Sequence, residues 1–76
     1  MENAVLDAAK KCEAGRLLAQ IRRADSMVVA VKAGAIAEGY VLGLETAGAL
    51  RAGDAENLYL VFESALQQRL KILIAC

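Results

Sequence analysis

The segment from Met27 to Leu44 is apolar on nearly every side of a helix, and this feature most constrains how the chain can fold. Valine, leucine and isoleucine side chains point in several directions around the helix axis, and only Lys32, Glu38 and Glu45 mark a narrow polar strip. A helix that is apolar all round must be buried nearly all round. One returning helix of about twenty residues cannot cover it, so we expect a second copy of the chain to do so.

Small residues recur every four positions in this segment, at Ala35, Gly39, Gly43 and Ala47. They fall along one slowly drifting face of a helix. Each glycine costs roughly 1 kcal/mol relative to alanine inside a helix. Close approach of another backbone offsets this cost through dispersion contacts. We therefore predict dimerisation or close helix packing at these four residues. Contact with another helix of the same chain remains the alternative.

The composition predicts a single small all-α domain over residues 1–76. The chain has no proline, and 58% of its residues are apolar, mainly alanine, leucine, valine and isoleucine. We expect a helix to begin near Asn3, which can cap it. The apolar phase continues across Asp25, which favours one long helix from about residue 3 to about 47, bent near 25. Two helices broken near 25, capped by Asp25 or Ser26, are the alternative. A strand at residues 27–31 is a weaker one.

The end of this helix is predicted at Gly48, in the left-handed conformation, with Leu50 folding back. A second helix should begin near Ala52, or near Ala55 with Asp54 as its cap. The expected architecture is a helical hairpin in which a short helix returns along a long one, assembled as a homodimeric helix bundle. The apolar tail, residues 70–76, should be buried against the long helix or lie in an interface.

Catalytic and cofactor chemistry is poorly supported by the sequence. The chain has no histidine, which excludes imidazole metal sites and histidine acid–base catalysis. No phosphate-binding glycine motif is present. Cys12 follows the apolar helical phase without a base to activate it, which predicts a packing role. Glu38 and Glu45 are about 10 Å apart along a helix, a separation typical of a solvated strip. We expect no enzyme activity, no metal and no cofactor.

The N-terminal residues contain no apolar leader, and two charges in the apolar segment would be costly in lipid. We therefore expect no membrane association and a cytoplasmic protein with reduced thiols.

Basic residues concentrate in the first half of the chain, although nine basic and nine acidic residues cancel overall. Acidic residues are interleaved with them, and no aromatic residue lies nearby to stack on bases, so nucleic acid is disfavoured. A solvated face is the simplest interpretation, and an acidic protein partner is the next. Tyr40, between two glycines, is of a type enriched at interfaces, or lies in the core with its hydroxyl at the edge. The predicted partner-binding residues are Arg16, Arg22, Arg23 and Tyr40.

The stretches AEGYVLGLETAGAL and AENLYLVFESALQQRL, within residues 37–70, resemble small all-α accessory proteins encoded by bacteriophages and mobile elements. The resemblance implies a non-enzymatic inhibitor that binds a bacterial host protein and blocks it by occupancy. A regulator, a motor ATPase or a defence complex would be such a host protein. A small DNA-binding protein that modulates transcription and a structural oligomerisation module are the alternatives.

Overall fold

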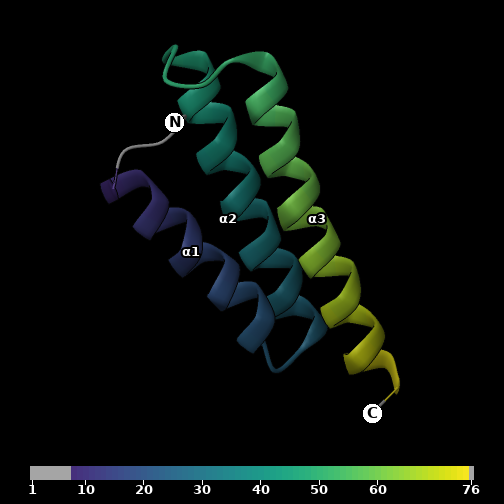
Figure 1. Ribbon diagram of the computed structural model, residues 1–76. Coiled ribbons are helices and arrows are strands. Elements are labelled where there is room, and N and C mark those ends of the chain that lie inside the picture. The colour runs from purple at the N-terminus through teal and green to yellow at the C-terminus, as the bar shows by residue number, and fades with distance from the viewer. Residues whose placement is uncertain (1–7, 76) are drawn as a thin grey trace.

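The structure, a computed structural model, describes residues 8–75, which form three helices packed against one another (Figure 1). The helices are α1 (Ala8–Arg23), α2 (Met27–Thr46) and α3 (Ala52–Ala75). They form a rod with principal extents of 40 × 19 × 15 Å. The described residues contain no strand, so the all-α prediction is confirmed and residues 27–31 are helical. The expected start near Asn3 lies outside the described residues.

The helix is interrupted around Asp25, between the end of α1 at Arg23 and the start of α2 at Met27. The favoured prediction of one continuous helix is therefore wrong, and the alternative of two helices broken near residue 25 is confirmed. Ser26 is the N-cap of α2 and has an extended backbone (φ −148°, ψ 161°), and its hydroxyl oxygen accepts a hydrogen bond from the Val29 N–H at 3.2 Å. This cap satisfies one of the N–H groups that a helix start leaves open. Folding back at this point lets Leu17 and Ile21 of α1 become buried, which a continuous rod would not allow.

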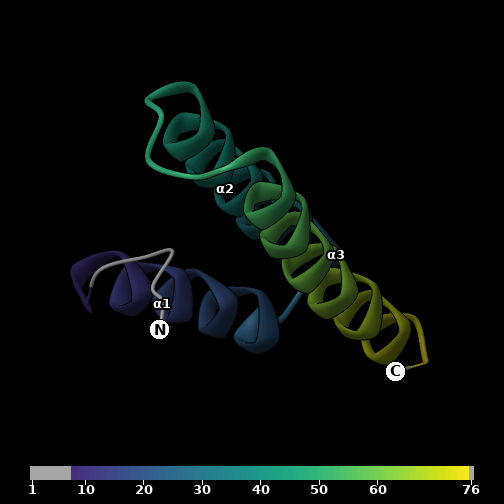
Figure 2. The same cartoon turned by 45° about the horizontal axis from the view of Figure 1, so that its top comes forward.

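The connection from α2 to α3 follows the prediction closely. Gly48 has a φ of +78°, and its N–H donates to the Glu45 carbonyl at 3.0 Å. The Ala49 N–H donates to the Leu44 carbonyl at 2.8 Å, which completes the Schellman pattern. Leu50 then folds back and is buried. Figure 2 shows α3 returning along α2 from this loop.

The returning helix is the longest of the three, with 24 residues against 20 for α2, so the prediction of a short returning helix is wrong. The apolar tail continues the helix to Ala75 instead of leaving it. Ile72 and Ile74 are exposed, so the expectation that the tail is buried against the long helix is also wrong for them.

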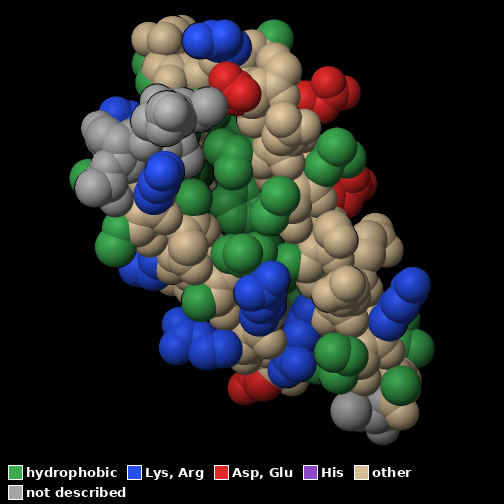
Figure 3. Space-filling model, in the orientation of Figure 1, with side chains coloured by type: hydrophobic (Ala, Val, Ile, Leu, Met, Phe, Trp, Pro, Cys, Tyr) green, Lys and Arg blue, Asp and Glu red, His purple; other side chains and the backbone are tan. Residues whose placement is uncertain are grey.

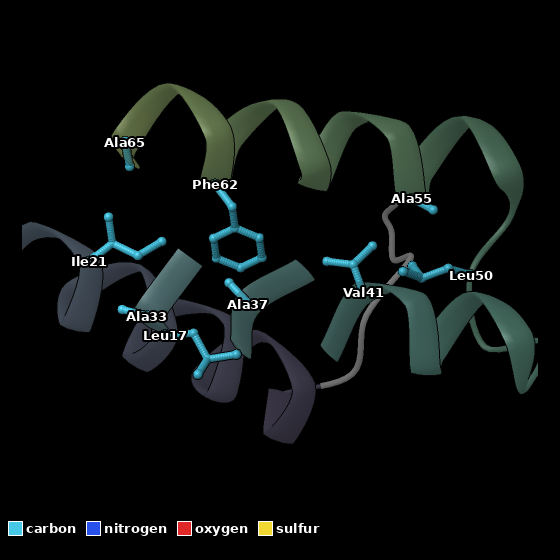
Figure 4. Packing of buried hydrophobic residues seen from close by; sticks show 9 residues of the cluster. All are labelled: Leu17, Ile21, Ala33, Ala37, Val41, Leu50, Ala55, Phe62 and Ala65. Carbon is cyan, nitrogen blue, oxygen red and sulfur yellow. The ribbon is translucent and has the colours of Figure 1, made fainter. Parts of the chain in front are cut away.

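The core combines small residues of α2 with large residues of its neighbours (Figure 4). Phe62 of α3 points towards Ala37 of α2, and Leu17 and Ile21 of α1 belong to the same buried cluster. Phe62, Ile21 and Val41 are the largest fully buried side chains. The buried cluster comprises Leu17, Ile21, Ala33, Ala37, Val41, Leu50, Ala55, Phe62 and Ala65. Because alanine occupies little space, the three helix axes can approach one large ring in the centre.

Gly34 is the glycine that permits close packing within the chain. A Cβ atom at this position would lie 2.8 Å from Cδ2 of Leu66 on α3. At Gly39 and Gly43 an added Cβ would meet nothing within 4 Å. The contact between α2 and α3 therefore uses a glycine outside the predicted four-residue repeat.

Candidate interaction surfaces

The side of α2 that faces away from the core is exposed and mainly apolar. At about 100° per residue, eight residues of α2, Ala35 included, lie within about 60° of Ala35, and all eight are exposed. They are Val28, Val31, Lys32, Ala35, Glu38, Gly39, Leu42 and Thr46. We call this set the outer face of α2. Val28 is 68% exposed and Leu42 is 56% exposed, which is high for large aliphatic side chains in a helix. The helix thus has two apolar sides, and α1 and α3 cover one of them.

All four residues of the predicted repeat, Ala35, Gly39, Gly43 and Ala47, are exposed. Ala35 and Gly39 lie within the outer face, whereas Gly43 and Ala47 lie beyond its edge, at about 80° and about 120° from Ala35. None of the four is buried by the other helices of the same chain, so the contact that they were predicted to make is not made inside the three-helix unit. Dimerisation through them stays a prediction.

Two of the four predicted partner-binding residues make contacts within the chain. Arg16 donates to both carboxylate oxygens of Glu13 on α1, with Nε at 3.1 Å from Oε1. This hydrogen bond lowers the pKa of Glu13, and the pair is exposed. The Tyr40 hydroxyl donates to the Lys10 carbonyl at 3.2 Å, and its half-buried ring packs against the core. Tyr40 therefore joins α2 to the first turns of α1 through its hydroxyl, while its ring packs within the chain.

The other two, Arg22 and Arg23, are exposed in the last turn of α1, where positive charge is favourable to the helix dipole. Arg23 lines a shallow hollow of about 530 Å³ between α1 and α2, together with Asp25 and Lys32. Arg22 lines a second hollow against α3. Figure 3 shows lysine and arginine side chains gathered over the lower part of the rod, near the α1–α2 connection. We call Arg22, Arg23, Lys32 and Arg69 the basic end.

Arg69 carries a contact that the sequence did not indicate. Its Nε donates to the Ala24 carbonyl at 2.6 Å, which joins α3 to the α1–α2 connection. The only signal in the sequence was an arginine in phase with the apolar residues Phe62, Leu66 and Leu73. The Arg69 guanidinium thus binds the backbone of the residue that directly follows the C-terminus of α1.

Replacing Arg69 with methionine should lower the free energy of unfolding by about 1–3 kcal/mol, because the Ala24 carbonyl loses a charged donor in a half-buried place. Methionine keeps most of the aliphatic stem, so the loss reports the hydrogen bond. Lys71→Met, on the same helix at an exposed position, is the matched control and should change stability by less than about 0.5 kcal/mol. Urea unfolding followed by circular dichroism measures both. Equal effects of the two substitutions would contradict a role for the Ala24 contact.

Cys12 is exposed on α1 and makes no disulfide, so the prediction that it packs in the core is wrong. On α1, Cys12 does not share the helix face of Leu17 and Ile21 closely, and the first turns of α1 lie at the margin of the core. Within residues 8–75, no three histidine, cysteine, aspartate or glutamate residues lie close enough together to hold a metal ion.

Among the described residues, α2 is the one helix long and apolar enough to cross a membrane. Core helices of soluble proteins and leader sequences meet the same test, so this finding is weak support for a membrane role. Only 28% of its most apolar window is buried, which is low for a core helix. Most of this window is therefore left exposed by α1 and α3.

Comparison with known proteins found no matching protein family, curated protein or solved structure.

Proposed function

We propose that this protein is a non-enzymatic protein-binding factor that assembles as a homodimer through the outer face of α2. The single observation that supports the proposal is the exposure of Val28, Val31 and Leu42 along a helix whose opposite side is already buried. Contiguous apolar surface of this kind on a small soluble domain marks an interaction site. A domain of this size also gains stability from a partner chain, since its own core is small.

A second copy is a better cover for this face than lipid. Lys32 and Glu38 lie in the middle of the helix, on the same side as the exposed aliphatic residues. In a bilayer both charges would lose hydration without a fixed counter-charge. In a protein interface they can stay at the rim, where charged side chains remain solvated.

We further propose that the dimer binds an acidic surface on a bacterial protein through the basic end and blocks that surface by occupancy. Arg22 and Arg23 are exposed there, and Arg23 lines the same hollow as Lys32. The resemblance of residues 37–70 to phage-encoded accessory proteins supports a host regulator, motor ATPase or defence complex as the target, and a bacterial cytoplasm as the setting. Asp25 interrupts the positive charge, and Tyr40, Tyr59 and Phe62 pack in or against the core, so stacking on bases has little support.

Light scattering coupled to gel filtration tests the homodimer. We expect about twice the protomer mass of 8.0 kDa at micromolar concentration. The same sample is mixed with phosphatidylcholine–phosphatidylglycerol vesicles and floated through a sucrose gradient. A folded species of one protomer mass in buffer overturns the homodimer, and its flotation with the vesicles would assign the outer face to lipid.

Affinity capture from bacterial lysate tests the target, with an Arg22→Ser/Arg23→Ser variant beside the wild type. We expect a stoichiometric protein that the variant loses and that 0.5 M salt releases, because exposed charge contacts are screened. Arg16→Ser is the control, since Arg16 is paired with Glu13. Capture that is equal for all three forms contradicts binding through the basic end. Steeply salt-dependent binding to duplex DNA in its place would favour a DNA-binding function.

A further inference from the structure

We propose that the two copies meet with their α2 helices parallel, around a two-fold axis that runs along the helices. This inference rests on the homodimer proposed above and specifies the arrangement of its partner. It follows from the distribution of charge along the two edges of the outer face.

The outer face has one basic edge and one acidic edge. At about 100° per residue, Lys32 lies about 60° to one side of Ala35, and Glu38 lies about 60° to the other side. Glu45, half-buried, falls on the same side as Glu38. Between the edges lie Val28, Ala35 and Leu42, seven residues apart, which is the spacing of a helix–helix seam.

The symmetry axis decides which edges meet. If the two-fold axis runs along the helices, the basic edge of each copy lies against the acidic edge of the other. The dimer then has two equivalent contacts between opposite charges. If the axis is perpendicular to the helices, which makes them antiparallel, each edge lies against its own counterpart. The edge that carries Glu38 and Glu45 would then lie against the acidic edge of the other copy, and Lys32 would lie on the two facing basic edges. Like charges on facing edges disfavour a complex, whereas opposite charges favour it and set its orientation.

The packing along the seam is compatible with the parallel arrangement. In a parallel dimer every residue near the axis meets its own counterpart, so Ala35 meets Ala35 and Gly39 lies beside Gly39. These small residues let the backbones approach closely in the middle of the interface. Val28 and Leu42, about 10 Å to either side of Ala35, form an apolar layer at each end.

The parallel arrangement also has a consequence for target binding. Both α1–α2 connections lie at the same end of the dimer, so Arg22 and Arg23 of the two copies gather at that end. A single acidic surface can then contact four arginines. Repulsion between the two basic ends acts through solvent and is screened over about 10 Å at 0.1 M salt.

Cysteine cross-linking tests the orientation in a Cys12→Ser/Cys76→Ser background. Val28→Cys and Leu42→Cys are oxidised separately and as a mixture. In the parallel dimer each variant alone forms a disulfide-linked dimer, because each position meets its own counterpart. Gly15→Cys on α1, exposed and away from the outer face, is the control and should stay monomeric on a denaturing gel. Linkage that requires the mixture, or that fails for both single variants in a dimeric protein, overturns the parallel arrangement.

Charge reversal provides an independent readout by sedimentation equilibrium. Lys32→Glu and Glu38→Lys should each weaken the dimer roughly tenfold. Each substitution makes two symmetry-related contacts repulsive, and each contact should change the dissociation constant about threefold. The double variant Lys32→Glu/Glu38→Lys should restore wild-type affinity. In an antiparallel dimer each reversal only exchanges one like-charged edge for another, so equal affinities of all four forms contradict the proposal. A wild type that sediments as a folded protomer overturns the homodimer itself, and with it this inference.

Discussion

Replacing Phe62 with alanine is expected to lower the free energy of unfolding by about 3–5 kcal/mol, as truncation of a buried aromatic residue commonly does. Phe62 is 2% exposed and is the one aromatic ring at the centre of the described core. Its neighbour Ala37 has no side-chain length with which to fill the space left behind. The cavity would therefore stay open, and the full penalty should be felt.

The expected loss is large beside the total stability of a small domain, about 5–15 kcal/mol. The variant should unfold at much lower urea concentration than the wild type at the same protein concentration. Leu60→Ala on the same helix is the control, because Leu60 is 57% exposed and should cost less than about 0.5 kcal/mol. A Phe62→Ala protein as stable as the Leu60→Ala protein would show that the three helices do not share this core.

The helix ends illustrate what the sequence could and could not reveal. Gly48 followed by Leu50 predicted the C-terminus of α2 correctly, because a left-handed glycine and a folded-back apolar residue are local features. The break at Asp25 has no glycine or proline, and the apolar phase runs through it unchanged. What decides the break is tertiary: α1 buries Leu17 and Ile21 only if the chain reverses. Periodicity alone contains no information about that reversal.

The candidate surfaces show the same division. The all-round apolarity of α2 was visible in the sequence, and the outer face is its structural counterpart. Which glycine meets a neighbouring helix was not visible, since Gly34 and Gly39 have similar surroundings in the sequence. Their difference depends on where Leu66 of α3 lies. Arg69 was equally hidden, because the carbonyl that it binds belongs to a residue 45 positions away.

Replacing Gly39 with leucine is expected to convert the proposed dimer into a stable monomer. An added Cβ at Gly39 meets nothing within 4 Å, so the three-helix unit has room for the side chain. Exchanging glycine for leucine inside a helix should stabilise the monomer by roughly 0.5–1 kcal/mol. In the dimer two leucines would enter the place of closest approach, and overpacking of about 1–3 kcal/mol per copy should weaken association about thirtyfold or more.

Two further substitutions make this result specific to the outer face. Gly15→Leu on α1 also has open space around it and should stabilise the protein without changing its mass in solution. Gly34→Leu should instead destabilise each protomer, because even a Cβ would lie 2.8 Å from Leu66. Light scattering and urea unfolding together distinguish the three outcomes.

The Gly39→Leu result bears on why a glycine stands at that position. If close contact between subunits is the reason, the substitution must weaken association and stabilise the protomer. Light scattering should then show less dimer, while urea unfolding should show a more stable protomer. If Gly39→Leu stabilises the protein and its dimer mass persists at the same dilution as the wild type, the backbones do not approach closely at this residue. The glycine would then be a helix defect without compensation, and the outer face would need an occupant that contacts only Val28, Val31 and Leu42.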